Sequence, residues 1–488
     1  MNNSKSYFFQ SFIILLLASL FFLGVKEVLP KKIFSEKAGT SKNVLIDSML
    51  IDAVNAAKKD KNAAIKDTLA NGIITYHETY GMAFPEEKLE NYTGNQYLIP
   101  FFEKLYQLET NKKGKIRIAY FGDSMTDGDM IVQDFRSNFQ EKFGGEGVGF
   151  VSITSESAGS RSSIEHQFSR NWKTLSYLNV KKPIRPFGVN GHVFFANDTV
   201  NPAWIKFKAK DGRFTSQLNN PTLFYGSADN YNGKIEYRIG NDTIRKDLVP
   251  EHLLNTIVLS STKLKSLKVN FKKVRSIPIY GFNFDDGKGV HVDNFSQRGN
   301  SGIPISKFDV ALMQAFQKQL AYDLIVLHYG TNVLNYGTLD FSWYDKSMTK
   351  TVNRLKECFP GVSILIVSTA DKSSKYDMKM KTDSAVVPLT KSQRNYALKT
   401  GCGFINLYTL MGGDGSMTRW VQQEPVMANK DYTHFNHRGA KKVAALLYEQ
   451  INSGYNQYKK LRKKGRGETG ETGSNETDTI LNTQDSNE

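Results

Sequence analysis

Two short motifs, far apart in the chain, carry side chains that could perform nucleophilic catalysis. The first is Gly122-Asp-Ser124, which follows the apolar segment 115–121 and precedes a segment with helical periodicity over 130–143. A serine between a strand and a helix has its hydroxyl at the carboxyl edge of a sheet, where the helix N-terminus favours developing negative charge. A plainer alternative is that Ser124 only caps this helix.

The second motif is Asp431-Tyr-Thr-His434, just before the last expected helix. A carboxylate at this offset from a histidine can orient the imidazole ring and stabilise its protonated form. His437 is a rival base, but it has no carboxylate at the same offset. Taken alone, the motif could equally belong to a surface loop.

Two further positions could donate hydrogen bonds to an oxyanion. Asn332, in Gly330-Thr-Asn, follows an expected buried strand over 322–329, and its amide could donate at the same sheet edge. Gly299 would let a backbone N–H approach the same point, because glycine has no side chain. Ordinary turn chemistry explains the Gly330 motif equally well.

Apolar strands alternate with helices around these motifs, which predicts an α/β fold with a parallel sheet covered on both faces. From about residue 155 to about 288 the pattern changes to about seven short alternating runs separated by turn signals, which is typical of a β-sandwich or jelly roll. We therefore expect an all-β domain inserted into the α/β domain. The expected strands of the α/β domain are 115–121, 322–329, 363–368 and 403–407, and its helices are 130–143, 342–359, 393–400 and 438–451.

The chain has 488 residues, of which 40% are hydrophobic, and a formal net charge of +16. This hydrophobic content excludes a disordered chain and a multi-span membrane protein. The charge fits any anionic partner: a nucleic acid, a membrane surface or an anionic polymer. The predicted segments are a signal anchor over 1–25, a polar stalk over 26–95, the α/β domain in two parts over 96–154 and 289–457, the inserted β-domain over 155–288 and a disordered tail over 458–488.

The first segment indicates export. The run 7–25 is apolar apart from one glutamine and two serines, and at a rise of about 1.5 Å per residue it would just cross a bilayer. No good small-x-small cleavage site is present, which favours an uncleaved signal anchor over a cleaved signal peptide. Cys358 and Cys402 could form a disulfide in an exported protein, or remain as two buried thiols.

Other kinds of site find little support in the sequence. The eight histidines have no metal-ligand spacing, and no glycine-rich phosphate loop or nucleic-acid motif is present. We therefore expect no metal, no cofactor and no nucleic-acid partner.

Taken together, the motifs resemble those of the SGNH (GDSL-type) hydrolase superfamily. Its four blocks match, in order, Gly122-Asp-Ser124, Gly299, Gly330-Thr-Asn332 and Asp431-Tyr-Thr-His434. The resemblance implies a flavodoxin-like three-layer sandwich with Ser124 as nucleophile, His434 as general base and Asp431 as its orienting carboxylate. It also implies an oxyanion hole formed by the backbone N–H groups of Ser124 and Gly299 and the side chain of Asn332.

The segment 143–150 and the β-domain before the second block resemble the peptidoglycan O-acetylesterase branch of this superfamily, which carries an inserted carbohydrate-binding-like jelly roll. Met125 departs from that branch, where histidine is common. Asp129 matches a recurrent acidic position of the branch, although an exposed acid in the first turn of a helix needs no function. The resemblance implies an esterase that removes O-acetyl groups from an envelope glycan on the periplasmic side, held to the membrane by its N-terminal helix. The alternatives are an O-acetyltransferase that acts on envelope polysaccharide and a non-catalytic glycan-binding protein.

Overall fold

The computed structural model describes residues 4–25, 47–59, 72–198, 201–336 and 339–468. The chain divides into two units, Met1–Val44 and Leu45–Glu488. The first contains helix α1 (Ser4–Val25). Among the described residues, no helix is long and apolar enough to cross a membrane.

A five-stranded parallel sheet forms the centre of the second unit, with the order β15-β3-β16-β17-β20. In chain order this is second, first, third, fourth and fifth, the arrangement of flavodoxin-like sheets. The strands are almost entirely buried, as expected for a parallel sheet covered on both faces. Their bounds are β15 (Gly289–Asn294), β3 (Lys115–Gly122), β16 (Leu324–His328), β17 (Ser363–Val367) and β20 (Gly403–Ile405).

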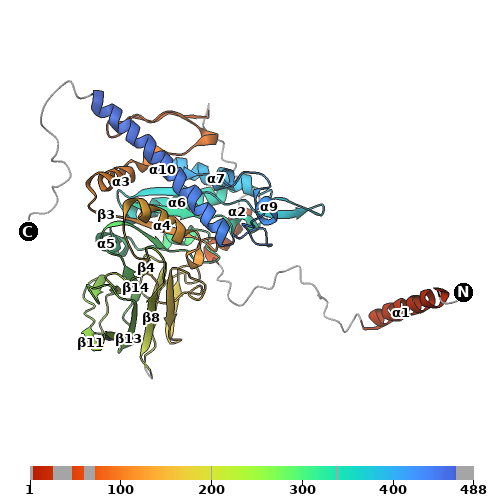
Figure 1. Cartoon of the computed structure of the whole chain (residues 1–488), viewed down its shortest axis with the longest axis horizontal. Helices are drawn as coiled ribbons and strands as arrows, with labels where there is room; N and C mark the ends of the chain where they lie inside the picture. Colours follow the sequence, from red (N-terminus) through yellow and green to blue (C-terminus); the bar gives the residue numbers. More distant parts are fainter. Residues whose placement is uncertain (1–3, 26–46, 60–71, 199–200, 337–338, 469–488) are drawn as a thin grey trace, which may run out of the picture. The chain divides into compact units, whose positions relative to one another are not determined.

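Helices cover this sheet and complete a three-layer α/β sandwich (Figure 1). Helices α3 and α4 both pack against α10, and α5 and α7 both pack against α6. The flavodoxin-like fold class predicted from the sequence is therefore confirmed. The helices are α3 (Ile99–Asn111), α4 (Val132–Phe143), α5 (Val310–Leu320), α6 (Ser342–Cys358), α7 (Val386–Lys399) and α10 (His437–Glu468).

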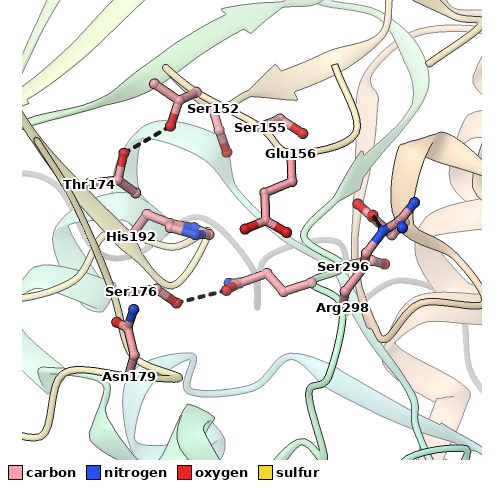
Figure 2. A pocket seen from close by; sticks show the side chains of 12 residues that line it. Ser152, Ser155, Glu156, Thr174, Ser176, Asn179, His192, Ser296 and Arg298 are labelled. Carbon is pink, nitrogen blue, oxygen red and sulfur yellow. Dashed lines mark hydrogen bonds and ion pairs between the residues drawn. The ribbon is translucent and has the colours of Figure 1, made fainter. Parts of the chain in front are cut away.

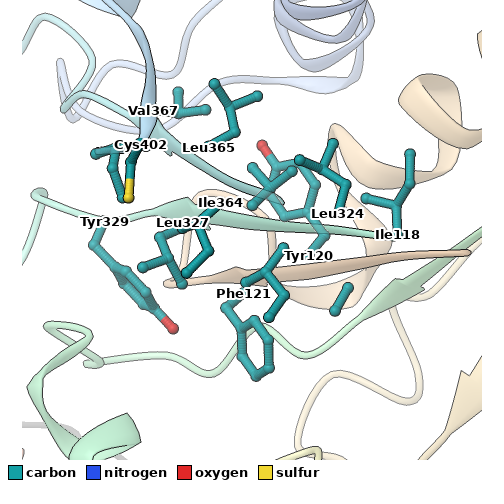
Figure 3. Close-up of a cluster of buried hydrophobic side chains, with 14 of the residues drawn as sticks. Ile118, Tyr120, Phe121, Leu324, Leu327, Tyr329, Ile364, Leu365, Val367 and Cys402 are labelled. Carbon is teal, nitrogen blue, oxygen red and sulfur yellow. The ribbon is translucent and has the colours of Figure 1, made fainter. Parts of the chain in front are cut away.

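Large apolar side chains from neighbouring strands fill the space between the sheet and its helices (Figure 3). Phe121 on β3 and Leu327 on β16 are both almost completely buried. Cys358 and Cys402 also lie in this core, and both are free thiols, which answers the question that the sequence left open. Short elements join the larger ones: η1 (Leu89–Asn91), η2 (Asn95–Leu98), η3 (Asp127–Asp129), η4 (Ile303–Lys307), η5 (Val333–Tyr336), α8 (Leu407–Leu410), α9 (Ser416–Gln422), β18 (Ser373–Tyr376) and β19 (Lys379–Thr382).

Two antiparallel sheets lie between β3 and β15 in the sequence and form the expected additional β-domain. Their orders are β11-β10-β13-β8-β5 and β12-β9-β14-β7-β6, and β4 pairs with β14. The sheets pack face to face, because Phe207 of one contacts Phe282 and Phe284 of the other. The strands are β4 (Gly149–Val151), β5 (Ile164–Phe168), β6 (Trp172–Ser176), β7 (His192–Ala196), β8 (Ala203–Ala209), β9 (Thr222–Gly226), β10 (Lys234–Ile239), β11 (Asp242–Asp247), β12 (Leu254–Val258), β13 (Ser266–Lys272) and β14 (Ile279–Phe284).

The predicted stalk over 26–95 is wrong for the part that the structure describes. Helix α2 (Ser48–Lys59) buries Leu50 and Val54 against the α/β domain, because its apolar residues recur at helical spacing. Just before it, the Asp47 carboxylate accepts a hydrogen bond from the Ser301 backbone N–H at 3.0 Å. Strands β1 (Ile73–Ile74) and β2 (Glu87–Lys88) then pair with each other.

The predicted boundary of the C-terminal tail, at 458, is also wrong. Helix α10 continues to Glu468, and Tyr458 is fully buried on it. Arg462 donates through Nε to Glu103 Oε2 at 3.0 Å, so part of the basic run 459–466 is paired with α3. The rest of the predicted tail, 469–488, lies outside the described residues.

Candidate active site

The segment after β3 holds Ser124 at the carboxyl edge of the sheet without making it a helix cap. The carbonyl of Asp123 accepts hydrogen bonds from the backbone N–H groups of Thr126 and Asp127, at 3.3 and 3.1 Å, which folds the segment into a tight turn. The N-cap of η3 is Thr126, and that of α4 is Ile131. The capping alternative for Ser124 is therefore wrong, and helix α4 begins further along the chain than the sequence predicted.

Ser124, His434 and Asp431 form one hydrogen-bonded chain. The Ser124 Oγ lies 3.0 Å from His434 Nε2, and His434 Nδ1 lies 2.8 Å from Asp431 Oδ2. The other oxygen of Asp431 accepts hydrogen bonds from the backbone N–H groups of Thr433 and His434, both at 3.0 Å. The structure thus brings together residues 310 positions apart in the sequence, in the geometry of a serine–histidine–aspartate triad.

The carboxylate of Asp431 fixes which nitrogen of His434 carries the proton. Partial burial opposes ionisation of Asp431, but the hydrogen bonds from His434 and Thr433 keep its pKa below the ordinary value. The ionised carboxylate accepts from Nδ1–H, so Nε2 has a free electron pair for the Ser124 hydroxyl. His437, the rival base, is an exposed residue at the start of α10.

Three segments meet beside Ser124 and include the predicted oxyanion donors. The Asn332 side chain donates to the carbonyl of Asn300 at 3.0 Å, which fixes the amide against the segment that carries Gly299. Gly299 has a φ of 76°, in the left-handed region that favours glycine. The same segment is held to the nucleophile turn by Ser296, whose hydroxyl lies 2.7 Å from that of Thr126.

The order of the strands in the parallel sheet explains why these segments meet. The order of the strands reverses between β3 and β16, and in open α/β sheets the crevice at such a point holds the ligand. Ser124 follows β3, and Asn332 follows β16, so both lie at this crevice. Gly299 follows β15, on the other side of β3.

Two carboxyl groups close to Ser124 in the chain, Asp123 and Asp129, are buried, which the sequence does not predict. Burial raises the pKa of Asp123 to about 6, and its Oδ1 accepts from the Met125 N–H at 2.9 Å. Asp129 is also fully buried; burial opposes its ionisation, but Arg136 holds its pKa well below the ordinary value through bonds of 2.9 and 3.0 Å. No periodicity in the sequence marks the burial of either residue, because Asp123 lies in a turn and Asp129 ends the short helix η3.

Within the described ranges, no group of three or more histidine, cysteine, aspartate and glutamate side chains is arranged to hold a metal ion.

No protein-family model matches the chain, and no curated protein matches it either. Among solved structures, that of a peptidoglycan O-acetylesterase matches with a TM-score of 0.60 and 21% identity, over 73% of this chain and 96% of the other. The chain shares the fold of this esterase. The resemblance inferred from the four motifs is thus confirmed at the level of the fold.

A family two carbohydrate esterase from Cellvibrio japonicus also matches, with a TM-score of 0.24 and 10% identity over 60% of this chain and 98% of the other. An acetyl xylan esterase matches with a TM-score of 0.24 and 15% identity, over 33% of this chain and 80% of the other.

Proposed function

We propose that the protein is a serine esterase that removes O-acetyl groups from a cell-envelope glycan, with peptidoglycan as the first candidate. The hydrogen-bonded chain from Asp431 through His434 to Ser124, open at the sheet edge, carries this proposal. The solved peptidoglycan O-acetylesterase that shares the fold supports the choice of substrate class.

In the proposed mechanism, Ser124 Oγ attacks the carbonyl carbon of the ester while His434 Nε2 takes the hydroxyl proton. The negative charge on the carbonyl oxygen is stabilised by the Asn332 amide and the backbone N–H groups of Gly299 and Ser124. The imidazolium, held by Asp431, then gives its proton to the sugar oxygen as the carbon–oxygen bond breaks. This leaves an acetyl-serine and a free sugar hydroxyl.

The second half of the reaction removes the acetyl group from Ser124. His434 takes a proton from a water molecule, whose oxygen attacks the acetyl carbon. Collapse of the second tetrahedral intermediate releases acetate and returns the proton to Ser124 Oγ. If a sugar hydroxyl takes the place of water, the same residues transfer the acetyl group to the sugar.

We further propose that the enzyme works in the cell envelope. The apolar run 7–25 and the net charge of +16 support this location, because a positively charged protein is attracted to anionic envelope polymers. Fractionation of cells that express the full chain tests this proposal: recovery in the envelope fraction is expected, and recovery with the cytosolic proteins would contradict it.

The activity is tested by incubating the full chain with O-acetylated peptidoglycan and with an aryl acetate, beside Ser124→Ala. Release of acetate from both substrates by the wild type alone is the expected result. Formation of an acetylated sugar only when a chitooligosaccharide acceptor is added would show an acetyltransferase instead. Glycan binding without turnover, equal in both proteins, would show a non-catalytic binding protein.

A further inference from the structure

A polar pocket of about 260 Å³ lies where the β-domain meets the loop after β15. One wall comes from the β-domain side of the chain: the loop after β4, strand β6 and strand β7. The opposite wall comes from η3 and the loop after β15. Figure 2 shows the lining side chains converging on this space, with the carboxylate of Glu156 directed toward its centre.

The pocket shares its walls with the candidate active site. Arg298 precedes Gly299, the candidate oxyanion donor, and pairs with Asp127 at 2.6 Å. Gln297, on the same loop, donates its backbone N–H to the carbonyl of Gly122 at 3.1 Å, two residues before Ser124. A molecule bound in the pocket therefore contacts the loop that helps to shape the oxyanion site.

The β-domain holds this loop from the other side. The Ser176 hydroxyl donates to Gln297 Oε1 at 2.9 Å, and Gln297 Nε2 donates to the carbonyl of Asn190 at 2.9 Å. Both polar ends of the Gln297 amide are thus occupied by the β-domain, and the side chain is almost completely buried. The wall of the pocket is built and held in place before any ligand arrives.

Several lining groups retain hydrogen-bonding capacity toward the pocket. His192 Nδ1 lies 2.9 Å from the carbonyl of Asn190, which requires a proton on Nδ1 and leaves Nε2 as an acceptor. Burial lowers the pKa of His192 to about 4, so its ring is neutral near pH 7. Within the described residues, no hydrogen bond or ion pair engages the Glu156 carboxylate, and burial together with the nearby Asp127 raises its pKa above the ordinary value.

The charges in the pocket disfavour an anionic ligand. Asp127 and Glu156 are acidic, Arg298 is the basic group, and His192 is neutral, so the lining carries a net negative charge. Phosphate or a carboxylate would meet both acidic groups. An uncharged molecule with several hydroxyl groups suits the arrangement better, because it can donate to Glu156 and His192 and accept from Arg298.

We propose that this pocket binds an uncharged sugar unit of the glycan, next to the unit whose ester Ser124 cleaves. The inference rests on the proposed function and makes it more specific: the enzyme recognises a chain of at least two sugar units, not an isolated acetyl ester. The β-domain then contributes directly to substrate selection through Glu156 and His192.

The test compares two substrates, an O-acetylated chitotetraose and 4-nitrophenyl acetate, with the full chain carrying Glu156→Ala or Asn179→Ala, both of which line the pocket. The ratio of kcat/KM for the oligosaccharide to kcat/KM for the aryl ester is expected to fall about tenfold or more in Glu156→Ala, because hydrogen bonds to a charged group are lost. In Asn179→Ala it is expected to fall about threefold, because the amide is neutral. Glu251→Ala, an exposed glutamate elsewhere on the β-domain, is the matched control and should leave this ratio unchanged.

Binding supplies a second measurement that does not depend on turnover. Ser124→Ala is titrated with unacetylated chitotetraose, alone and combined with Glu156→Ala, and the double variant is expected to bind about tenfold more weakly. Failure of Ser124→Ala to bind, equal affinities of the two proteins, or an unchanged kcat/KM ratio would each overturn the inference. Wild-type turnover by Ser124→Ala would instead overturn the proposed function, while the titration would still decide whether the pocket binds sugar.

Discussion

Two clusters of ionisable side chains lie at the same parallel sheet, one at its carboxyl edge and one along its strands, and the clusters differ in burial. In the triad, the side chains of His434 and Asp431 are 38% and 49% exposed. Beside β3 and β15, the Arg117 and Asp293 side chains are fully buried, with Nε and Oδ2 2.7 Å apart. The exposed cluster can exchange protons with a substrate and water, whereas the buried cluster has no access to either.

The buried cluster joins the β-domain to the catalytic sheet. Arg117 on β3 also pairs with Asp285, just after β14, and Asp293 Oδ1 accepts from the backbone N–H of Phe150 on β4 at 2.8 Å. Tyr322 donates its hydroxyl to Asp293 Oδ2 at 2.6 Å. Similar charged hydrogen bonds therefore support chemistry at one end of β3 and domain attachment along its length.

The largest effect should come from the exposed cluster and should appear in activity alone. His434→Ala removes the proposed general base, and we expect kcat to fall about 10⁴- to 10⁶-fold. The free energy of unfolding should change by less than about 1 kcal/mol, because the ring is partly exposed. Steady-state kinetics and urea unfolding measure the two quantities. His437→Ala is the matched control; if it were inactive beside a working His434→Ala, the assignment of the base would be wrong.

The buried cluster should give the opposite result. Arg117→Met leaves Asp293 and Asp285 without their counter-charge, and we expect the free energy of unfolding to fall by about 3–5 kcal/mol. Lys234→Ala, which breaks an exposed pair with Asp247, should cost less than about 1 kcal/mol. Urea unfolding of the two variants measures the difference, and equal losses would show that burial does not set the cost of breaking an ion pair in this protein.

Substitution of Asn332 tests whether the segment that follows β16 contributes to the chemistry. Loss of one oxyanion donor typically lowers kcat by about 10²- to 10³-fold, and we expect Asn332→Ala to do the same. KM should change much less, since the donor acts mainly in the transition state. A rise in KM with unchanged kcat would show instead that Asn332 only binds substrate.

Substitution of Asp123 should give the smallest effect, a change in the free energy of unfolding that depends on pH. Its pKa rises from 3.8 to about 6 on folding, so between these values the folded state binds more protons than the unfolded state. Its contribution to the free energy of unfolding therefore falls as the pH increases through this window, by up to about 3 kcal/mol. Asp123→Asn cannot ionise and should lack this fall.

Urea unfolding of the wild type and of Asp123→Asn at pH 4 and pH 6.5 measures this fall in the free energy of unfolding. The variant should gain stability relative to the wild type at the higher pH. A difference between the two proteins that stays constant with pH would show that Asp123 ionises without hindrance in the fold.

Local patterns in the sequence were sufficient to predict the α/β fold and to single out the residues that form the hydrogen-bonded triad. Continuous apolar runs marked the buried parallel strands, and the motif around Ser124 lies at the end of one of them. The Asp431 offset from His434 placed both side chains in one short loop, where they meet.

Contacts between distant segments could not be predicted in this way. Asp47 is hydrogen-bonded to Ser301, 254 residues later in the chain. Because no local pattern marks this contact, the residues around Asp47 resembled a polar stalk. Asp129 was expected to be an exposed acid in the first helical turn. It is instead buried at the end of η3, with a φ of 68°, and accepts a hydrogen bond from Arg136.

The central claim is that Ser124 is the nucleophile of an esterase, and a covalent trap tests it most directly. An aryl alkylphosphonate transfers its phosphonyl group to an activated serine, and the adduct resists hydrolysis. Mass spectrometry of the digested protein should place one phosphonyl group on Ser124, with activity lost in proportion to labelling and no label in His434→Ala. Full activity of the protein labelled at Ser124, or complete inactivation with the label on another residue, would contradict the account.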